Sequence, residues 1–119
     1  NVRMAVLLHS ERAWAVTGAV ARAQSGGSEL VVTTLRPVGT TQRVINEGLG
    51  ASVHRPQHRL QIEKSGRATH FLHVLQSKAP GAPDLSVAVT EEAGRYVVRV
   101  GAAVVRLNAG DRAAGMTVA

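Results

Sequence analysis

The chain has 119 residues and no cysteine, and its 14 Lys and Arg against 8 Asp and Glu give a formal net charge of +6 at pH 7. This length fits one domain, and the lack of cysteine excludes disulfides, thiol nucleophiles and cysteine-based zinc sites. No run of about 18 apolar residues is present, so we expect no membrane span. Twelve of the cations are Arg, the better bidentate partner for carboxylate or sulfate, and the composition therefore permits an anionic partner.

The first half of the chain alternates apolar and polar residues with the period of a strand. Residues 2–9 predict one strand and residues 13–23 a second, although the alanines of the second also fit a helix. Two glycines within residues 25–28 predict a tight turn that leads into a strand at residues 29–35, which together form a hairpin. Glycines and a proline punctuate residues 38–57, where we expect a long connection.

The second half continues the pattern of strand and turn. We expect strands at residues 59–63, 69–76, 85–90, 95–100 and 102–107, with turns at residues 64–67 and 79–83. About eight strands at regular spacing predict an all-β fold, namely an antiparallel β-sandwich. We expect residues 1–119 to form a single domain of this kind. Because the chain opens at Asn1 and not at Met, we also expect it to be part of a larger protein.

One basic segment stands out as a candidate site. His54 and His58 have the i, i+4 spacing of a metal-binding pair on a helix, but Pro56 lies between them and disfavours that helix. The segment is then either a solvated basic loop or a contact for an anionic polymer. We predict that His54, Arg55, His58 and Arg59 bind an acidic polysaccharide, and we expect no metal and no cofactor.

The remaining candidates for chemistry have simpler interpretations. His70 and His73 fall on opposite faces of a regular strand, so each is interpreted as a structural histidine. Glu91 and Glu92 are neighbours in a predicted turn and do not converge as catalytic carboxylates must. The only aromatic residues are one Trp, one Tyr and one Phe, and no basic helix is predicted. Nucleic-acid binding is therefore not expected.

Four segments resemble, in order, strands of the C-terminal β-region of heparinase II/III-like polysaccharide lyases. Residues 6–10, VLLHS, resemble that family's "LLHS" strand, and residues 29–37, ELVVTTLRP, resemble its "L-x-V-x-x-L-x-P" strand. Residues 69–76, THFLHVLQ, resemble its "FLHVL" strand. Residues 96–107 resemble its final hairpin, with Leu107 in a position that is aromatic in the family.

The resemblance implies a function for the parent protein more than for this chain. Members of the family join a helical toroid to antiparallel sheets and cleave uronic-acid polysaccharides by β-elimination. No catalytic motif of the family is matched here, so no catalytic residue is assigned, and the chain alone is not expected to be an enzyme. We expect a non-catalytic C-terminal β-domain of a bacterial lyase, periplasmic or extracellular, which supports the catalytic domain of the parent protein and contacts anionic polysaccharide. The alternatives are a stand-alone module that binds an acidic glycan or protein, and a purely structural domain.

Overall fold

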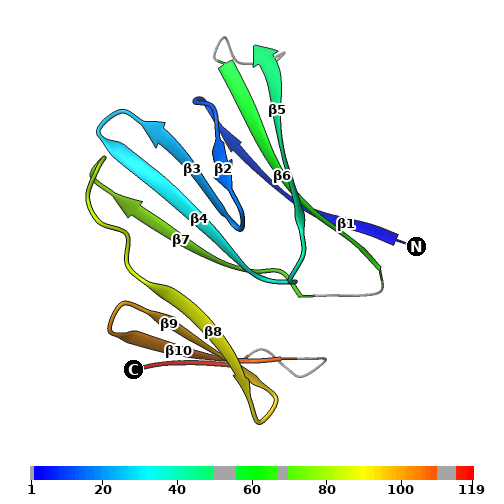
Figure 1. Ribbon diagram of the computed structural model, residues 1–119, viewed down its shortest axis with the longest axis vertical. Helices are drawn as coiled ribbons and strands as arrows, with labels where there is room; N and C mark the ends of the chain where they lie inside the picture. Colours follow the sequence, from blue (N-terminus) through cyan, green and yellow to red (C-terminus); the bar gives the residue numbers. More distant parts are fainter. Residues whose placement is uncertain (1, 50–55, 67–69, 110–114) are drawn as a thin grey trace. The chain divides into compact units, whose positions relative to one another are not determined.

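The computed structural model describes residues 2–49, 56–66, 70–109 and 115–119, and Figure 1 shows their arrangement in strands. These residues form eleven strands and no helix, so none of them builds a helix that could span a membrane. The strands are β1 (Val2–Ser10), β2 (Ala15–Thr17), β3 (Val20–Ser25), β4 (Ser28–Arg36), β5 (Thr41–Leu49), β6 (Pro56–Gly66), β7 (Leu72–Lys78), β8 (Val87–Glu92), β9 (Arg95–Val100), β10 (Ala103–Asn108) and β11 (Met116–Val118). Every strand pair is antiparallel, which confirms the all-β antiparallel prediction.

The chain divides into two compact units, Asn1–Ala82 and Pro83–Ala119. The first unit contains a three-stranded sheet in the order β1-β6-β5 and a four-stranded sheet in the order β2-β3-β4-β7. The second unit is a four-stranded meander in the order β11-β10-β9-β8, in which Val97 and Val98 of β9 are buried. That residues 1–119 fold as one domain stays a prediction.

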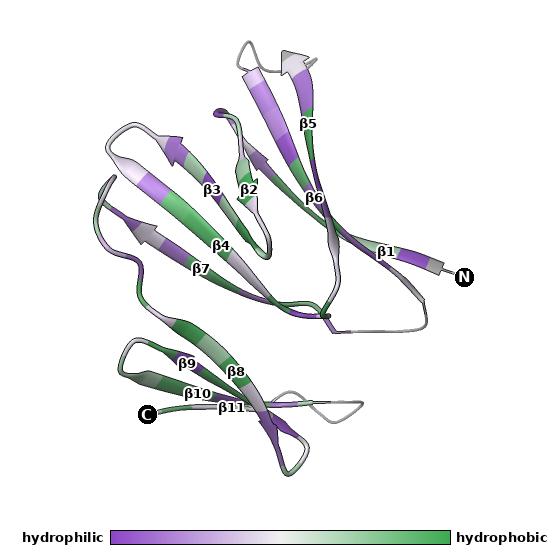
Figure 2. Cartoon of the chain, viewed as in Figure 1, coloured by the Kyte–Doolittle hydropathy of each residue, from purple (hydrophilic) through white to green (hydrophobic). Residues whose placement is uncertain are grey.

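The core of the first unit joins its two sheets, which gives the sandwich-like arrangement. Its buried side chains are Trp14, Ala21, Ala23, Val32, Leu60 and Ile62. Leu60 and Ile62 alternate on β6, whereas the small Ala21 and Ala23 alternate on β3 of the other sheet, so large side chains meet small ones. Figure 2 shows the apolar residues in the middle of β4, the strand that carries Val32.

Trp14 is the largest of these core residues and also a link between the sheets. It lies in the connection between β1 and β2 and is only 6% exposed. Its indole N–H donates a hydrogen bond of 3.2 Å to the backbone carbonyl of His58 on β6. The ring therefore fills the core while its polar group is satisfied by the facing sheet.

The prediction of one strand over residues 13–23 is wrong, because the segment folds back on itself. Gly18 has φ of +58° in the turn between β2 and β3, and Thr17 pairs with Val20 across it. A left-handed φ is readily adopted only by glycine, so Gly18 supplies the turn that the alternating pattern concealed. Ala21 and Ala23 still share one face, because the alternation within β3 is regular.

The long connection expected at residues 38–57 is also wrong, because β5 occupies much of it. β5 lies at the edge of the order β1-β6-β5 formed by the described residues, and its polar residues suit a strand with one solvated side. β6 is longer than the predicted strand 59–63, since Lys64, Ser65 and Gly66 continue its pairing with β1 where a turn was expected. Pairing with β1 overrides the turn propensity of these three residues.

The core packing generates a stability prediction. Leu60 is fully buried between the sheets, so Leu60→Ala should lower the free energy of unfolding by about 2–5 kcal/mol, through lost burial and the cavity left behind. Leu75 is 54% exposed on β7, and Leu75→Ala should cost about 0.5 kcal/mol or less. Urea denaturation of both variants measures the difference, and equal losses would contradict the assignment of Leu60 to the core.

Candidate functional site

The alternation of β6 gives the β1-β6-β5 sheet one apolar and one polar face. Leu60 and Ile62 point into the core, so Arg59, Gln61 and Glu63 lie on the opposite face. The register places residues of both neighbouring strands on this same face. Together they form what we call the outer face: Arg3, Ala5, Leu7 and His9 of β1, Thr41, Arg43 and Ile45 of β5, and Arg59, Gln61, Glu63 and Ser65 of β6.

Glu63 lies at the centre of one end of the outer face. Its carboxylate lies 3.9 Å from Nε of Arg3 through Oε2 and 3.9 Å from Nε of Arg43 through Oε1. Gln61 donates a further hydrogen bond to the carboxylate from its side-chain amide. The residues directly opposite Glu63 are the smaller Ala5 and Thr41, which leave room for the two arginines to reach in from the diagonal positions.

The two arginines remain open to solvent although the carboxylate between them is buried. The side chains of Arg3 and Arg43 are 66% and 53% exposed, against 9% for Glu63. Lys64 extends from the adjacent position of β6, and its ammonium donates to the carbonyls of Val38 at 3.0 Å and Gly39 at 3.4 Å. Two arginine side chains therefore flank one carboxylate at this end of the sheet.

These groups line a shallow pocket of about 420 Å³, which we call the arginine pocket. Its lining residues are Arg3, Gly39, Thr41, Arg43, Glu63, Lys64 and Ser65. The charge of the lining is positive, and two hydroxyl groups stand beside the cations. Guanidinium groups can present a planar fork of donors to a carboxylate or sulfate, and hydroxyls can bind sugar hydroxyls. The arrangement is suited to holding an anionic group.

The other end of the outer face is a closed ion-pair cluster. Glu47 accepts from Nε2 of His9 at 3.0 Å and lies 3.4 Å from the guanidinium of Arg59. Glu47 stands at a bulge of β5, where Gly48 with φ of +69° donates its N–H to the side chain of Asn46 at 2.9 Å. Arg59 is 27% exposed, and its charge is already matched by Glu47.

The predicted basic segment does not form one loop. His54 and Arg55 lie outside the described residues, whereas His58 and Arg59 belong to β6. Because His58 and Arg59 are neighbours on a strand, their side chains point to opposite faces of the sheet. Arg59 shares the outer face with the arginine pocket, four residues from Glu63 or roughly 13 Å along β6. A role of these four residues in binding stays a prediction.

The contacts of His73 are those expected of a structural histidine. Its Nδ1 shares a hydrogen bond of 3.2 Å with the hydroxyl of Thr34, and its ring stacks on Phe71 with 6.1 Å between centroids. Burial lowers the pKa of His73 below its ordinary value, which favours the neutral ring. Among the residues that the structure describes, no group of three His, Asp or Glu side chains is placed to hold a metal ion.

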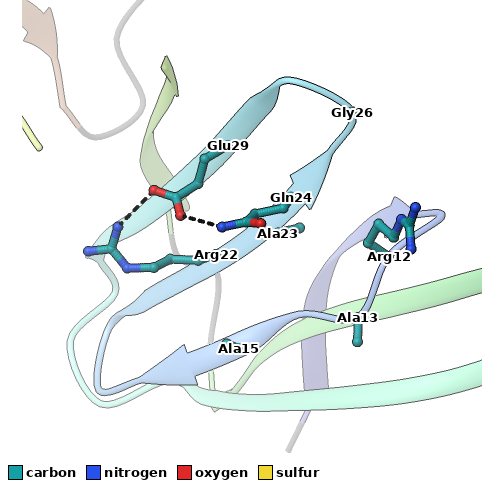
Figure 3. A pocket seen from close by; sticks show the side chains of 8 residues that line it. All are labelled: Arg12, Ala13, Ala15, Arg22, Ala23, Gln24, Gly26 and Glu29. Carbon is teal, nitrogen blue, oxygen red and sulfur yellow. Dashed lines mark hydrogen bonds and ion pairs between the residues drawn. The ribbon is translucent and has the colours of Figure 1, made fainter. Parts of the chain in front are cut away.

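A second buried carboxylate, Glu29, lies on the other sheet of the first unit. Its Oε1 lies 2.9 Å from the ammonium of Lys78 and 3.4 Å from the guanidinium of Arg22, and its Oε2 accepts from the amide of Gln24 at 3.4 Å. Figure 3 shows Glu29 between Arg22 and Gln24. The hydrogen bond from Lys78, followed by that from Gln24, holds the pKa of Glu29 below its ordinary value of 4.5. Glu29 is thus an anchor that joins β3, β4 and β7.

A scan against protein-family models finds no match, and searches of curated proteins and of solved structures find none either. The resemblance to heparinase II/III-like lyases therefore stays a prediction.

The depressed pKa of Glu29 generates a prediction on acid stability. The folded state binds its proton less tightly than the unfolded chain, so Glu29 contributes stability above pH 4.5 that is lost as the pH falls below 4.5 through the folded pKa. Glu29→Gln should remove that part of the acid dependence, and so should Lys78→Met, which deletes the largest cause. Urea denaturation at a series of pH values tests this, and variant curves parallel to that of the wild type would contradict it.

Proposed function

We propose that this chain is a β-domain that binds acidic polysaccharide through the arginine pocket on the outer face of the β1-β6-β5 sheet. The observation that carries the proposal is the pair of exposed guanidinium groups, Arg3 and Arg43, held on either side of one buried carboxylate. Glu63 balances one of them, and Lys64 adds a further cation at the rim. The pocket therefore keeps an excess of positive charge that an external anion can match.

The form of the pocket favours a polymer of sugars with carboxylate or sulfate groups. It is shallow and lies on a sheet face, so a chain can lie across it without being enclosed. Arg3 and Arg43 supply donors for the anionic group, while the hydroxyls of Thr41 and Ser65 are placed for neutral groups of the same sugar. An aromatic platform is not part of the pocket lining, so charge carries most of the recognition.

We further propose that the chain is the non-catalytic C-terminal β-domain of a bacterial heparinase II/III-like polysaccharide lyase, secreted to the periplasm or beyond. The four resembling segments support this proposal. The domain would support the catalytic domain and hold the anionic polymer near it. The alternative is a stand-alone module for an acidic glycan or protein, which the arginine pocket supports equally. A gene that encodes a helical toroid upstream of this chain distinguishes the first from the second.

The arginine pocket generates a binding prediction. The double change Arg3→Ala and Arg43→Ala should weaken binding of oligouronate by about fivefold or more, since two exposed charge pairs are lost. Binding by the wild type should weaken as salt rises, because exposed charges are screened. Titration calorimetry at low and moderate salt measures both effects.

The matched control removes two arginines from the second unit. Arg95 and Arg99 are exposed on β9, so Arg95→Ala with Arg99→Ala changes the net charge equally without touching the arginine pocket. This control should bind oligouronate nearly as well as the wild type. If both double variants lose the same affinity, only net charge matters, and the assignment to the pocket is wrong.

The same proposal predicts no cleavage by the chain alone. Purified chain mixed with heparin, heparan sulfate or alginate should give no steady rise in the ultraviolet absorbance of unsaturated uronate products. A parent protein that contains the toroid should give that rise. Sustained cleavage by the purified chain would overturn the non-catalytic assignment.

A further inference from the structure

The sheet β2-β3-β4-β7 has an edge that is only partly covered. β2 pairs with β3 from Thr17↔Val20 to Ala15↔Arg22 and goes no further, although β3 continues to Ser25. The chain before Ala15 does not pair with β3, and Figure 3 shows Arg12 and Ala13 on the segment that leads into β2, apart from the β3 residues Ala23 and Gln24. Among the residues that the structure describes, no strand therefore pairs with the last part of β3 on that side.

The direction of the backbone at Gln24 follows from the ladder with β4. The carbonyl of Ala19 accepts a hydrogen bond of 2.9 Å from the N–H of Thr34, so the backbone groups of Ala19 point toward β4. Backbone groups point to alternate sides along a strand. Those of Ala21, Ala23 and Ser25 then point toward β4, and those of Val20, Arg22 and Gln24 toward β2. Gln24 lies beyond the end of β2, so its N–H and C=O face the open edge.

A pocket of about 670 Å³ opens at this edge. Its lining residues are Arg12, Ala13, Ala15, Arg22, Ala23, Gln24, Gly26 and Glu29. Three of them are alanines, whose small side chains leave the width of the gap unfilled. The pocket thus combines an uncovered strand edge with room beside it.

The charges around the pocket favour an acidic occupant. Glu29 is already matched by Lys78 at 2.9 Å and Arg22 at 3.4 Å. Arg12 is exposed and makes no ion pair with any described residue, although its backbone N–H donates to Ser10. Arg12 is therefore the surplus cation of the lining.

We propose that this edge receives an extended peptide segment of a partner protein, which adds to the sheet as a strand beside residues 23–25 and places an acidic side chain at Arg12. Addition of a strand to an open sheet edge gives affinity through main-chain hydrogen bonds, while the side chains give specificity. Gln24 supplies one donor and one acceptor on the open side. This peptide site shares no residue with the arginine pocket and does not depend on its function.

The test uses a short capped peptide of alternating Asp and Val as the probe, with the full chain as the receptor. The wild type should bind this probe, and it should bind a peptide with Lys in place of Asp more weakly.

Gln24→Pro removes the outward N–H at a position where an edge strand tolerates proline. It should weaken binding roughly fivefold relative to Gln24→Ala, which keeps the N–H and loses the same side-chain contact. Arg12→Gln should reduce the preference for the acidic probe.

A second arm keeps the proposal testable if Gln24→Pro fails to fold. The probe with N-methylated amides retains its carboxylates but loses its main-chain donors, and it should not bind the wild type. Equal binding of methylated and unmethylated probes, or of Gln24→Pro and Gln24→Ala, would overturn the proposal. Displacement of the probe by oligouronate with the Arg3 and Arg43 double variant as receptor would assign the edge to a glycan instead. Self-association of the wild type that Gln24→Pro abolishes would assign it to a second copy of the chain.

Discussion

The register of β6 is the constraint on which the rest of the first unit depends. Leu60 and Ile62 face the other sheet, and this fixes Glu63 and Arg59 on the solvent side. A shift by one residue would bring Glu63 into an apolar core without its cations, at a large cost in free energy. The hydrogen bond from Trp14 to the carbonyl of His58 ties the same strand to the connection that precedes β2. Packing and the placement of charge therefore enforce one register together.

Two buried carboxylates in this unit serve different purposes because their cations are held differently. Glu29 receives Lys78 at 2.9 Å, and the side chain of Lys78 is itself only 13% exposed, so the pair is a closed structural link. Glu63 is approached by Arg3 and Arg43 only to 3.9 Å, and both guanidinium groups extend into solvent. The Glu63 carboxylate therefore orients both arginines, while their guanidinium N–H donors stay available to an external anion. This difference is the reason that the outer face, and not the Glu29 cluster, is the candidate anion site.

Alternation of apolar residues was enough to predict the fold class and several strands, since β9 spans the residues expected and the hairpin β3–β4 turns at its two glycines. Alternation did not predict the structure correctly where the same short pattern fits both a continuous strand and a turn, or both a loop and a polar strand. A turn at Gly18 is hidden in an alternating alanine run, and β5 is too polar to be recognised without its partner strand. Arg3 and Arg43 lie forty positions apart, and only the pairing of β1 and β5 with β6 brings them to Glu63. The basic segment at residues 54–59 was visible in the sequence, but strand geometry separates His58 from Arg59.

The two proposed sites use different groups of a β-sheet, namely side chains on a face and backbone groups at an edge. The arginine pocket uses side chains on a face, so its affinity arises mainly from charge and is sensitive to ionic strength. The edge beside Gln24 uses backbone groups, whose hydrogen bonds are neutral and depend on the shape of the partner more than on salt. Since the sites lie on different sheets of the first unit and have no residue in common, the two proposals are compatible: a polymer on one sheet would not exclude a protein strand that extends the other. Such an arrangement would allow the first unit to join an acidic polymer to a partner protein.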